Sequence, residues 1–210
     1  MAVKVLGIST SPRANSNSDL LLKQALAGAQ STGAQTEYIR LCDLNIAACI
    51  ECNHCYETGE CKIEDDYQML SAKILDADRL ILATPVFFMT VCAQAKMLID
   101  RCQCLWAHKV ILKKPLSAAG RDRRAMVIAV GGSKSKKMFE SIRLTMSSFF
   151  DVLDINYAFN LFVNKVDAAG DIEKHPTAMK QAHHLGRQLA DTPAQRWAGS
   201  PKKPTDVELT

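Results

Sequence analysis

The sequence predicts a single α/β domain built on a parallel β-sheet with helices on both faces. Segments with strand character alternate five times with segments of helical periodicity, which is the arrangement that generates parallel strands. The chain has 210 residues, of which 48% are hydrophobic, so it can bury a substantial core within one domain.

The first part of the chain supplies two strands and a helix. Residues 3–8 (VKVLGI) form a short apolar run, and the polar loop STSPRANSNS follows it. A helix is expected from about Asp19, because leucine and alanine recur at helical spacing as far as Leu26. Residues 36–41 (TEYIRL) alternate apolar and polar side chains, which is typical of a strand.

The middle of the chain continues this alternation. Tyr67, Leu70 and Ile74 have the spacing of one helical face, which predicts a helix over 66–77. RLILATPVFF then predicts a third strand that ends in an apolar loop, and a helix from Ala93 to Trp106 follows.

The last third of the chain supplies two more strands. Residues 125–132 (AMVIAVGG) predict a strand that stops at paired glycines, and a helix is expected over 136–153. A fifth strand over 155–163 precedes a closing helix over 173–190. From Thr192 the chain is rich in proline and has no periodicity, so we expect a mobile tail or an arm that reaches a neighbouring subunit.

Five parallel strands of this kind suit a flavodoxin-like doubly wound sheet with strand order 2-1-3-4-5. Ligands of such sheets lie beyond the carboxyl ends of the strands, so the loops after strands one, three and four are expected to converge. We therefore expect one domain over 1–191, with a cysteine-rich insert at 45–65, and the tail over 192–210.

The loop after the first strand offers ligands for a monophosphate at a helix N-terminus. It lacks both the G-x-x-x-x-G-K of a P-loop and the G-x-G-x-x-G of a dinucleotide-binding turn. A capped turn without a ligand is the alternative. The candidate phosphate-binding residues are Ser9, Ser11, Arg13, Asn15, Asn17 and Ser18.

The loops after the third and fourth strands predict a site for a flat apolar ring. An aromatic segment at the carboxyl end of a strand is hard to explain by solvent exposure, and a cofactor ring lying on it would explain it. Packing into the core or into a dimer interface is the alternative. The candidate ring-binding residues are Thr84, Pro85, Val86, Phe87, Phe88 and Met89, together with Gly131, Gly132 and Ser133.

The stretch CIECNHCYETGEC places Cys49, Cys52, Cys55 and Cys61 at the spacing C-x2-C-x2-C-x5-C. Structural zinc sites more often combine two separated pairs of ligands, whereas closely spaced thiols let one loop wrap a compact iron–sulfur cluster. A cluster, unligated thiols, and a zinc ion or redox disulfide all stay open on the spacing alone. The other cysteines are expected to be structural.

Three of these motifs together resemble the flavodoxin-fold NADPH-dependent FMN reductases, and within them the iron–sulfur flavoproteins. They are SPR-x3-NS (Ser11–Ser18), TPVFF continuing into AQ-x-K-x-LIDR (Ala93–Arg101), and the cysteine stretch followed by Asp65 and Asp66. The resemblance implies FMN, with its phosphate on Ser11, Arg13, Asn17 and Ser18 and its ring along Pro85–Met89, and a [4Fe–4S] cluster on the four cysteines.

The chain departs from the family pattern at two places. Thr10 stands where a glycine is usual, and Phe87–Phe88–Met89 stands where the family commonly has Tyr–Phe–Gly. The missing phenol removes a hydrogen bond to the flavin, and methionine adds bulk beside it.

We therefore expect an FMN-dependent redox protein that transfers electrons between a donor and an acceptor through FMN and a [4Fe–4S] cluster. NAD(P)H or a carrier such as ferredoxin would be the partner. The alternatives are an NAD(P)H-dependent FMN or quinone reductase without a cluster, and a zinc-stapled interaction module without catalytic activity. No nucleophile and base are paired in a hydrolase motif, so no catalytic residue is assigned.

The expected surroundings follow from charge and hydropathy. The absence of a long apolar run and of a secretory signal predicts a cytoplasmic protein with no membrane partner, and a net charge of +4 does not indicate nucleic acid. The basic segment 109–137 has two interpretations, a solvated face or a docking patch for an acidic carrier that includes Lys113, Lys114, Arg121, Arg123 and Arg124. The resemblance further implies a homo-oligomer, either a dimer or a tetramer.

Overall fold

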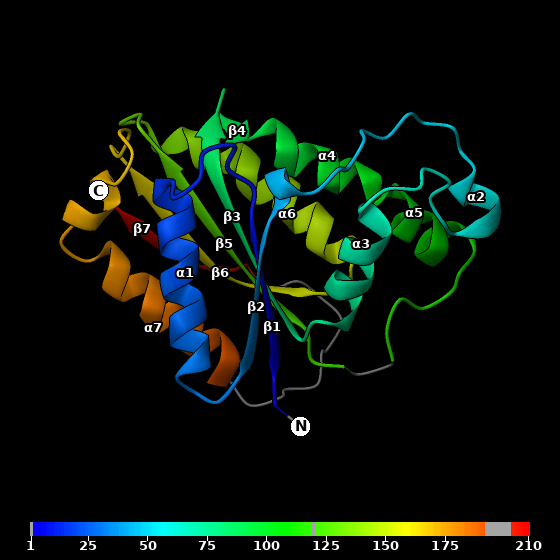
Figure 1. The fold of residues 1–210 in the computed structure, drawn as a ribbon, viewed down its shortest axis with the longest axis horizontal. Helices are drawn as coiled ribbons and strands as arrows, with labels where there is room; N and C mark the ends of the chain where they lie inside the picture. The colour runs from blue at the N-terminus through cyan, green and yellow to red at the C-terminus, as the bar shows by residue number, and fades with distance from the viewer. Residues whose placement is uncertain (1, 119–120, 192–202) are drawn as a thin grey trace.

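The computed structural model describes residues 2–118, 121–191 and 203–210. Figure 1 shows one twisted sheet between two helical layers. The layer formed by α1 (Asn17–Gln30) and α7 (Ala178–Asp191) covers one face of the sheet, and α3 (Tyr67–Asp76), α4 (Ala93–Arg101) and α6 (Glu140–Val152) cover the other.

The sheet has seven strands, and six of them are parallel in the order β2-β1-β3-β5-β6-β7. Two-residue β4 pairs antiparallel with β3. The strands are β1 (Lys4–Ser9), β2 (Gln35–Arg40), β3 (Arg79–Phe87), β4 (Thr90–Val91), β5 (Arg124–Gly131), β6 (Asn156–Asn164) and β7 (Thr205–Leu209).

Short helical turns complete the fold. Two single-turn α-helices lie near the cysteine stretch, and the chain after the second of them continues as a π-helical turn. The α-helices are α2 (Cys55–Thr58) and α5 (Gln103–Trp106), the π-helical turn is η2 (Ala107–Ile111), and the 3₁₀ turns are η1 (Leu41–Asp43), η3 (Lys136–Phe139) and η4 (Asp171–Lys174).

The predicted doubly wound sheet is confirmed, since the five expected strands are β1, β2, β3, β5 and β6 in the expected order. Two strands were not expected. β4 turns the apolar loop after β3 into a hairpin. In the expected tail, 192–202 lie outside the described residues, while β7 pairs with β6 and its Asp206 and Glu208 form ion pairs with Arg143 of α6.

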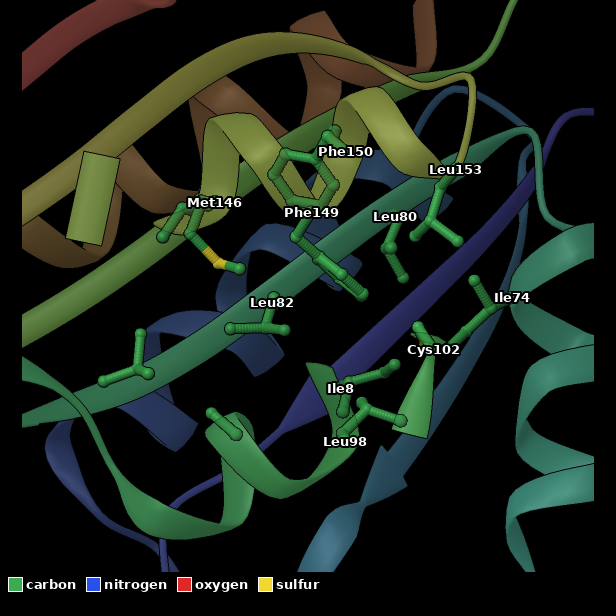
Figure 2. Close-up of a cluster of buried hydrophobic side chains, with 14 of the residues drawn as sticks. Ile8, Ile74, Leu80, Leu82, Leu98, Cys102, Met146, Phe149, Phe150 and Leu153 are labelled. Carbon is green, nitrogen blue, oxygen red and sulfur yellow. The ribbon is translucent and has the colours of Figure 1, made fainter. Parts of the chain in front are cut away.

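The core divides into two apolar clusters, one on each face of the sheet. Figure 2 shows the larger cluster, in which Phe149 and Phe150 of α6 and Leu153, directly after that helix, face Leu80 and Leu82 of β3. Side chains of α3, α4 and β1, such as Ile74, Leu98 and Ile8, belong to the same cluster, and Cys55 and Cys61 of the cysteine stretch pack against it.

The basic segment includes arginines that belong to the interior. Arg123 is 2% exposed, and its guanidinium donates hydrogen bonds to the carbonyl oxygens of Ile74, Ala77 and Leu153 at the ends of α3 and α6. A cation at helix C-termini is favoured by the helix dipoles and satisfies carbonyls that lack intrahelical partners. Burial lowers the pKa of Arg123 to about 10.

The interpretation of this segment as a docking patch is therefore wrong for its three arginines, which are engaged within the fold. Arg123 is structural, Arg124 is 7% exposed and pairs with Asp122, and Arg121 pairs with Asp78. Lys113 and Lys114 remain at the surface. Among the described residues, no helix combines the length and hydropathy needed to cross a lipid bilayer.

Helices α1 and α7 approach each other so closely that glycine is required on both. A Cβ atom added to Gly28 would lie 1.9 Å from the carbonyl oxygen of His183, and one added to Gly186 would lie 1.9 Å from that of Ala25. Backbone atoms cannot yield at such distances without separating the helices.

Replacement of Gly28 or Gly186 by alanine is expected to destabilise the fold by about 3 kcal/mol, because the helices must separate to admit the methyl group. Thermal unfolding should show a fall in Tm of about 6 °C or more. Ala27→Ser, on the exposed side of α1, is the matched control and should change stability by only about 0.5 kcal/mol. Equal Tm values for Gly28→Ala and the control would contradict the contact.

Candidate functional site

The loops after β1, β3 and β5 meet at the carboxyl edge of the sheet. The backbone N–H and the hydroxyl of Thr10 both donate to the carbonyl oxygen of Ala83, each at 2.9 Å. On the other side of β3, a Cβ atom added to Gly131 would lie 3.1 Å from Cβ of Val86. The strand ends from which the three predicted loops leave therefore lie side by side, and the close approach of β5 to Val86 leaves little room for a side chain at position 131.

The loop after β1 forms a buried polar cradle at the N-terminus of α1. Ser16 caps the helix by accepting a hydrogen bond from the backbone N–H of Asp19 at 3.3 Å. The predicted residues Arg13 and Asn15 are exposed at the rim, and Asn15 has a φ of 51°. The buried polar residues of the cradle are Ser9, Thr10, Ser11, Ser16, Asn17 and Ser18.

The side-chain amide of Asn17 is already engaged. It donates to the carbonyl oxygen of Ala168 at 2.8 Å and accepts from the backbone N–H of Ile172 at 3.3 Å. The amide thus ties α1 to the loop after β6. The backbone N–H of Asn17 lies in the first turn of α1, where N–H groups have no intrahelical acceptor.

Asp19 places a buried carboxylate in the first turn of α1. Burial opposes its ionisation, but hydrogen bonds from Tyr38 and Lys23 outweigh that effect and lower the pKa of Asp19. Burial and the hydrogen bond to Asp19 raise the pKa of Tyr38 to about 12. The sequence did not predict this pair, because Asp19 lies on α1 and Tyr38 lies on β2.

The hairpin formed by β3 and β4 presents aromatic and apolar side chains at its tip. Phe87 pairs with Thr90 across a two-residue turn, and the turn residues Phe88 and Met89 have φ values of 45° and 64°. Such turns usually contain Asn–Gly, and left-handed bulky residues often mark functional sites. Phe88 is fully exposed, so the tip offers an unpartnered apolar surface.

The remaining predicted ring residues line the base of this hairpin. Thr84 is buried and its hydroxyl accepts the backbone N–H of Cys92 at 3.2 Å, while Pro85 and Val86 are half-buried. Gly131 is buried, whereas Gly132 and Ser133 are exposed. All of the ring candidates therefore lie around one edge of the sheet.

The cysteine stretch forms a separate loop beside α4, α5 and α6. Glu51, Asn53 and Gly59 adopt left-handed φ values of 53°, 58° and 78°, which curl the chain. Cys49 and Cys52 are exposed, and the other two cysteines of the stretch are half-buried. All four thiols are free and line a cavity of about 710 Å³ that none of the predicted flavin residues lines.

The four thiols influence one another electrostatically. Burial raises the pKa of Cys55, and the sulfurs of Cys52, Cys61 and Cys49 add to that increase. Within the described part of the chain, no group of three or more His, Cys, Asp or Glu side chains is drawn together around a single metal ion. Ligands of a multinuclear cluster bind different iron atoms and do not need that convergence. The donor set fits such a cluster, since thiolates are its ligands.

A buried ion pair lies under the cysteine loop. Asp65 and Arg101 have side-chain exposures of 5% and 0%, with Asp65 Oδ2 2.6 Å from Arg101 Nη1. Burial opposes ionisation of Asp65, but hydrogen bonds from Arg101 and from the backbone N–H groups of Ala47 and Tyr67 lower its pKa. The sequence motifs contained both residues without indicating that they contact each other.

Helix α4 connects the two regions. At its N-terminal end, the Cys92 thiol donates to the carbonyl oxygen of Thr10 at 3.1 Å and lies 3.2 Å from the Thr10 hydroxyl. At its C-terminal end lies Arg101. The same helix therefore contacts both the loop after β1 and the cysteine loop.

The chain is similar to proteins of known class. The sequence profile of the NADPH-dependent FMN reductase family matches residues 3–161. An iron–sulfur flavoprotein of Methanocaldococcus jannaschii is 33% identical over 197 residues, which cover 90% of this chain and 96% of that protein. An iron–sulfur flavoprotein of Archaeoglobus fulgidus is 27% identical over 207 residues, which cover 99% of this chain and 87% of that protein.

Solved structures share the fold. An NAD(P)H:quinone oxidoreductase from Methanothermobacter marburgensis matches with a TM-score of 0.72 at 16% identity, over 93% of this chain and 100% of that chain. The matched family segment contains the loop after β1, the cysteine stretch and the hairpin. The chain therefore belongs to the NADPH-dependent FMN reductase family, as an iron–sulfur flavoprotein and a flavin-dependent oxidoreductase.

Proposed function

We propose that the protein transfers electrons between a donor and an acceptor through FMN and a [4Fe–4S] cluster. The observation that carries this proposal is the set of four free thiols on one loop, lining one cavity, in a chain that belongs to a flavin reductase family. The ligands would be Cys49, Cys52, Cys55 and Cys61. FMN accepts electrons in pairs and releases them singly, and the cluster carries one at a time.

The cradle after β1 would bind the FMN phosphate. Its buried hydroxyls and the N-terminus of α1 favour an anion, and Arg13 at the rim would add a charged donor. Ser9, Ser11, Asn15, Asn17 and Ser18 would contribute hydroxyl, amide or backbone donors. These groups would fix the end of the cofactor that takes no part in electron transfer.

The hairpin and the loop after β5 would hold the flavin ring. Thr84, Pro85 and Val86 would form its base, and Phe87, Phe88 and Met89 would shield it from water. Gly131, Gly132 and Ser133 would lie along the opposite edge, where the absence of side chains at two positions allows backbone N–H groups to approach.

The partners are proposed from the exposed surface. NAD(P)H would be the donor to the flavin, and a carrier such as a ferredoxin would exchange electrons with the cluster on the exposed cysteine loop. A homo-oligomer is supported by the exposed apolar side chains of Phe88 and Leu144. The hairpin tip is joined to α6 by a hydrogen bond from Ser141 to the Met89 carbonyl oxygen, and Leu144 lies three residues after Ser141 on that helix.

Anaerobically purified protein is expected to contain about four iron and four sulfide ions per chain, with an EPR signal that appears on reduction by dithionite. Cys55→Ser should lose most of the iron because a ligand is removed, whereas Cys42→Ser, outside the loop, should retain it. A yellow protein without iron would instead favour an FMN or quinone reductase without a cluster. Stoichiometric zinc without flavin absorbance would favour the zinc-stapled module.

Arg13→Ala is expected to weaken FMN binding about tenfold or more while leaving riboflavin binding unchanged, because only FMN carries the phosphate. Quenching of flavin fluorescence measures both affinities on the flavin-free protein. Arg187→Ala removes an exposed guanidinium from α7 and serves as the matched control. Equal losses for FMN and riboflavin would exclude a phosphate contact at Arg13.

A further inference from the structure

Arg101 closes the base of the cysteine loop from the interior. It is the last residue of α4 and is 1% exposed. Its Nη1 donates to the carbonyl oxygen of Ala47 at 2.9 Å, two residues before Cys49. Its Nη2 donates to the carbonyl oxygen of Ile63 at 3.1 Å, two residues after Cys61. One side chain therefore holds both ends of the loop.

Asp65 and Tyr67 hold the guanidinium in this position. The Asp65 carboxylate accepts hydrogen bonds from both Nη atoms of Arg101, at 2.6 and 3.1 Å, and from the backbone N–H of Ala47 at 2.8 Å. The guanidinium lies over the Tyr67 ring, 4.6 Å from its centroid. A bidentate pair stacked on an aromatic ring has little freedom to rotate.

The fifth donor of this guanidinium is unused. Arg101 Nε is buried and has no hydrogen-bond partner in the part of the chain that the structure describes, although buried donors are normally paired. Arg101 and Cys61 line the same cavity. The unpaired Nε–H of Arg101 is therefore available to donate a hydrogen bond to the sulfur of Cys61 once that thiol is a thiolate.

We propose that Arg101 is a positioning residue for the metal centre, which closes the cysteine loop through Ala47 and Ile63 and donates its Nε–H to the sulfur of Cys61. This inference rests on the proposed function, because the acceptor is the sulfur of a cluster ligand. Hydrogen bonds to ligating sulfurs draw negative charge from a cluster and stabilise its reduced state. Arg101 would therefore raise the reduction potential of the cluster.

The closing of the loop is tested by limited trypsin digestion of the anaerobically purified protein. Lys62 is exposed and directly precedes Ile63, so cleavage after Lys62 reports release of the Ile63 carbonyl. In Arg101→Lys the fragment ending at Lys62 should appear about tenfold faster, because lysine cannot hold both carbonyls and cleavage follows the population of the open loop. An unchanged rate would overturn the clamp.

The hydrogen bond to Cys61 is tested by EPR-monitored redox titration. Arg101→Lys and Arg101→Gln should each lower the equilibrium constant for reduction of the cluster about tenfold. The reduction potential should therefore fall by about 59 mV for this one-electron step. Lys96→Gln is the matched control, because it removes an exposed cation from the same helix and cavity, and it should leave the potential and the digestion unchanged. Circular dichroism shows whether each variant folds. If Arg101→Gln fails to fold, the result for Arg101→Lys decides the test.

The outcomes separate this inference from the proposed function. Wild-type protein without iron would overturn the proposed function, and with it the hydrogen bond from Arg101 to a cluster ligand. The trypsin digestion would then still decide whether Arg101 closes the cysteine loop. Iron-loaded variants with unchanged potentials overturn the hydrogen bond while the proposed function stands. An equal shift in Lys96→Gln would assign the effect to cavity charge and also overturn it.

Discussion

The position of β3 between β1 and β5 is the constraint on which the rest of the molecule depends. Parallel pairing aligns the carboxyl ends of these three strands, so the loops that follow them must share one edge of the sheet. The hydrogen bonds from Thr10 to Ala83 and the contact between Gly131 and Val86 follow from that alignment. The proposed flavin-binding region is therefore a consequence of strand order rather than of any single motif.

Helix α4 extends this constraint to the cysteine loop. It begins directly after the hairpin and ends at Arg101, and a helix of nine residues rises about 13 Å. Cys92 fixes its first turn against Thr10 and Thr84, and the ion pair of Arg101 with Asp65 fixes its last. Two regions that are far apart in the sequence are thus attached to opposite ends of one rigid element.

The sequence predicted those parts of the fold whose signal is local. Apolar runs and helical spacing predict the strands β1, β2, β3, β5 and β6, but β4 has only two residues and its turn lacks glycine and asparagine. β7 carries acidic residues whose partners, such as Arg143, lie on α6, so no pattern within the strand predicts it. Arg123 was interpreted as a surface charge because its carbonyl partners are distant in sequence.

The candidate site shows the same limit. Thiol spacing identified the cysteine loop, whereas the contact between Asp65 and Arg101 spans 36 positions and is visible only in the fold. Because Ala47 and Ile63 share that guanidinium, the chain leaves and re-enters the domain at neighbouring points. The residues between them pack on α5 and on η2, and within the described chain none of them pairs with a strand of the sheet. The insert is anchored through one side chain at its base, so a change of the thiols within it would alter the proposed metal chemistry of the scaffold while leaving the register of the strands in place.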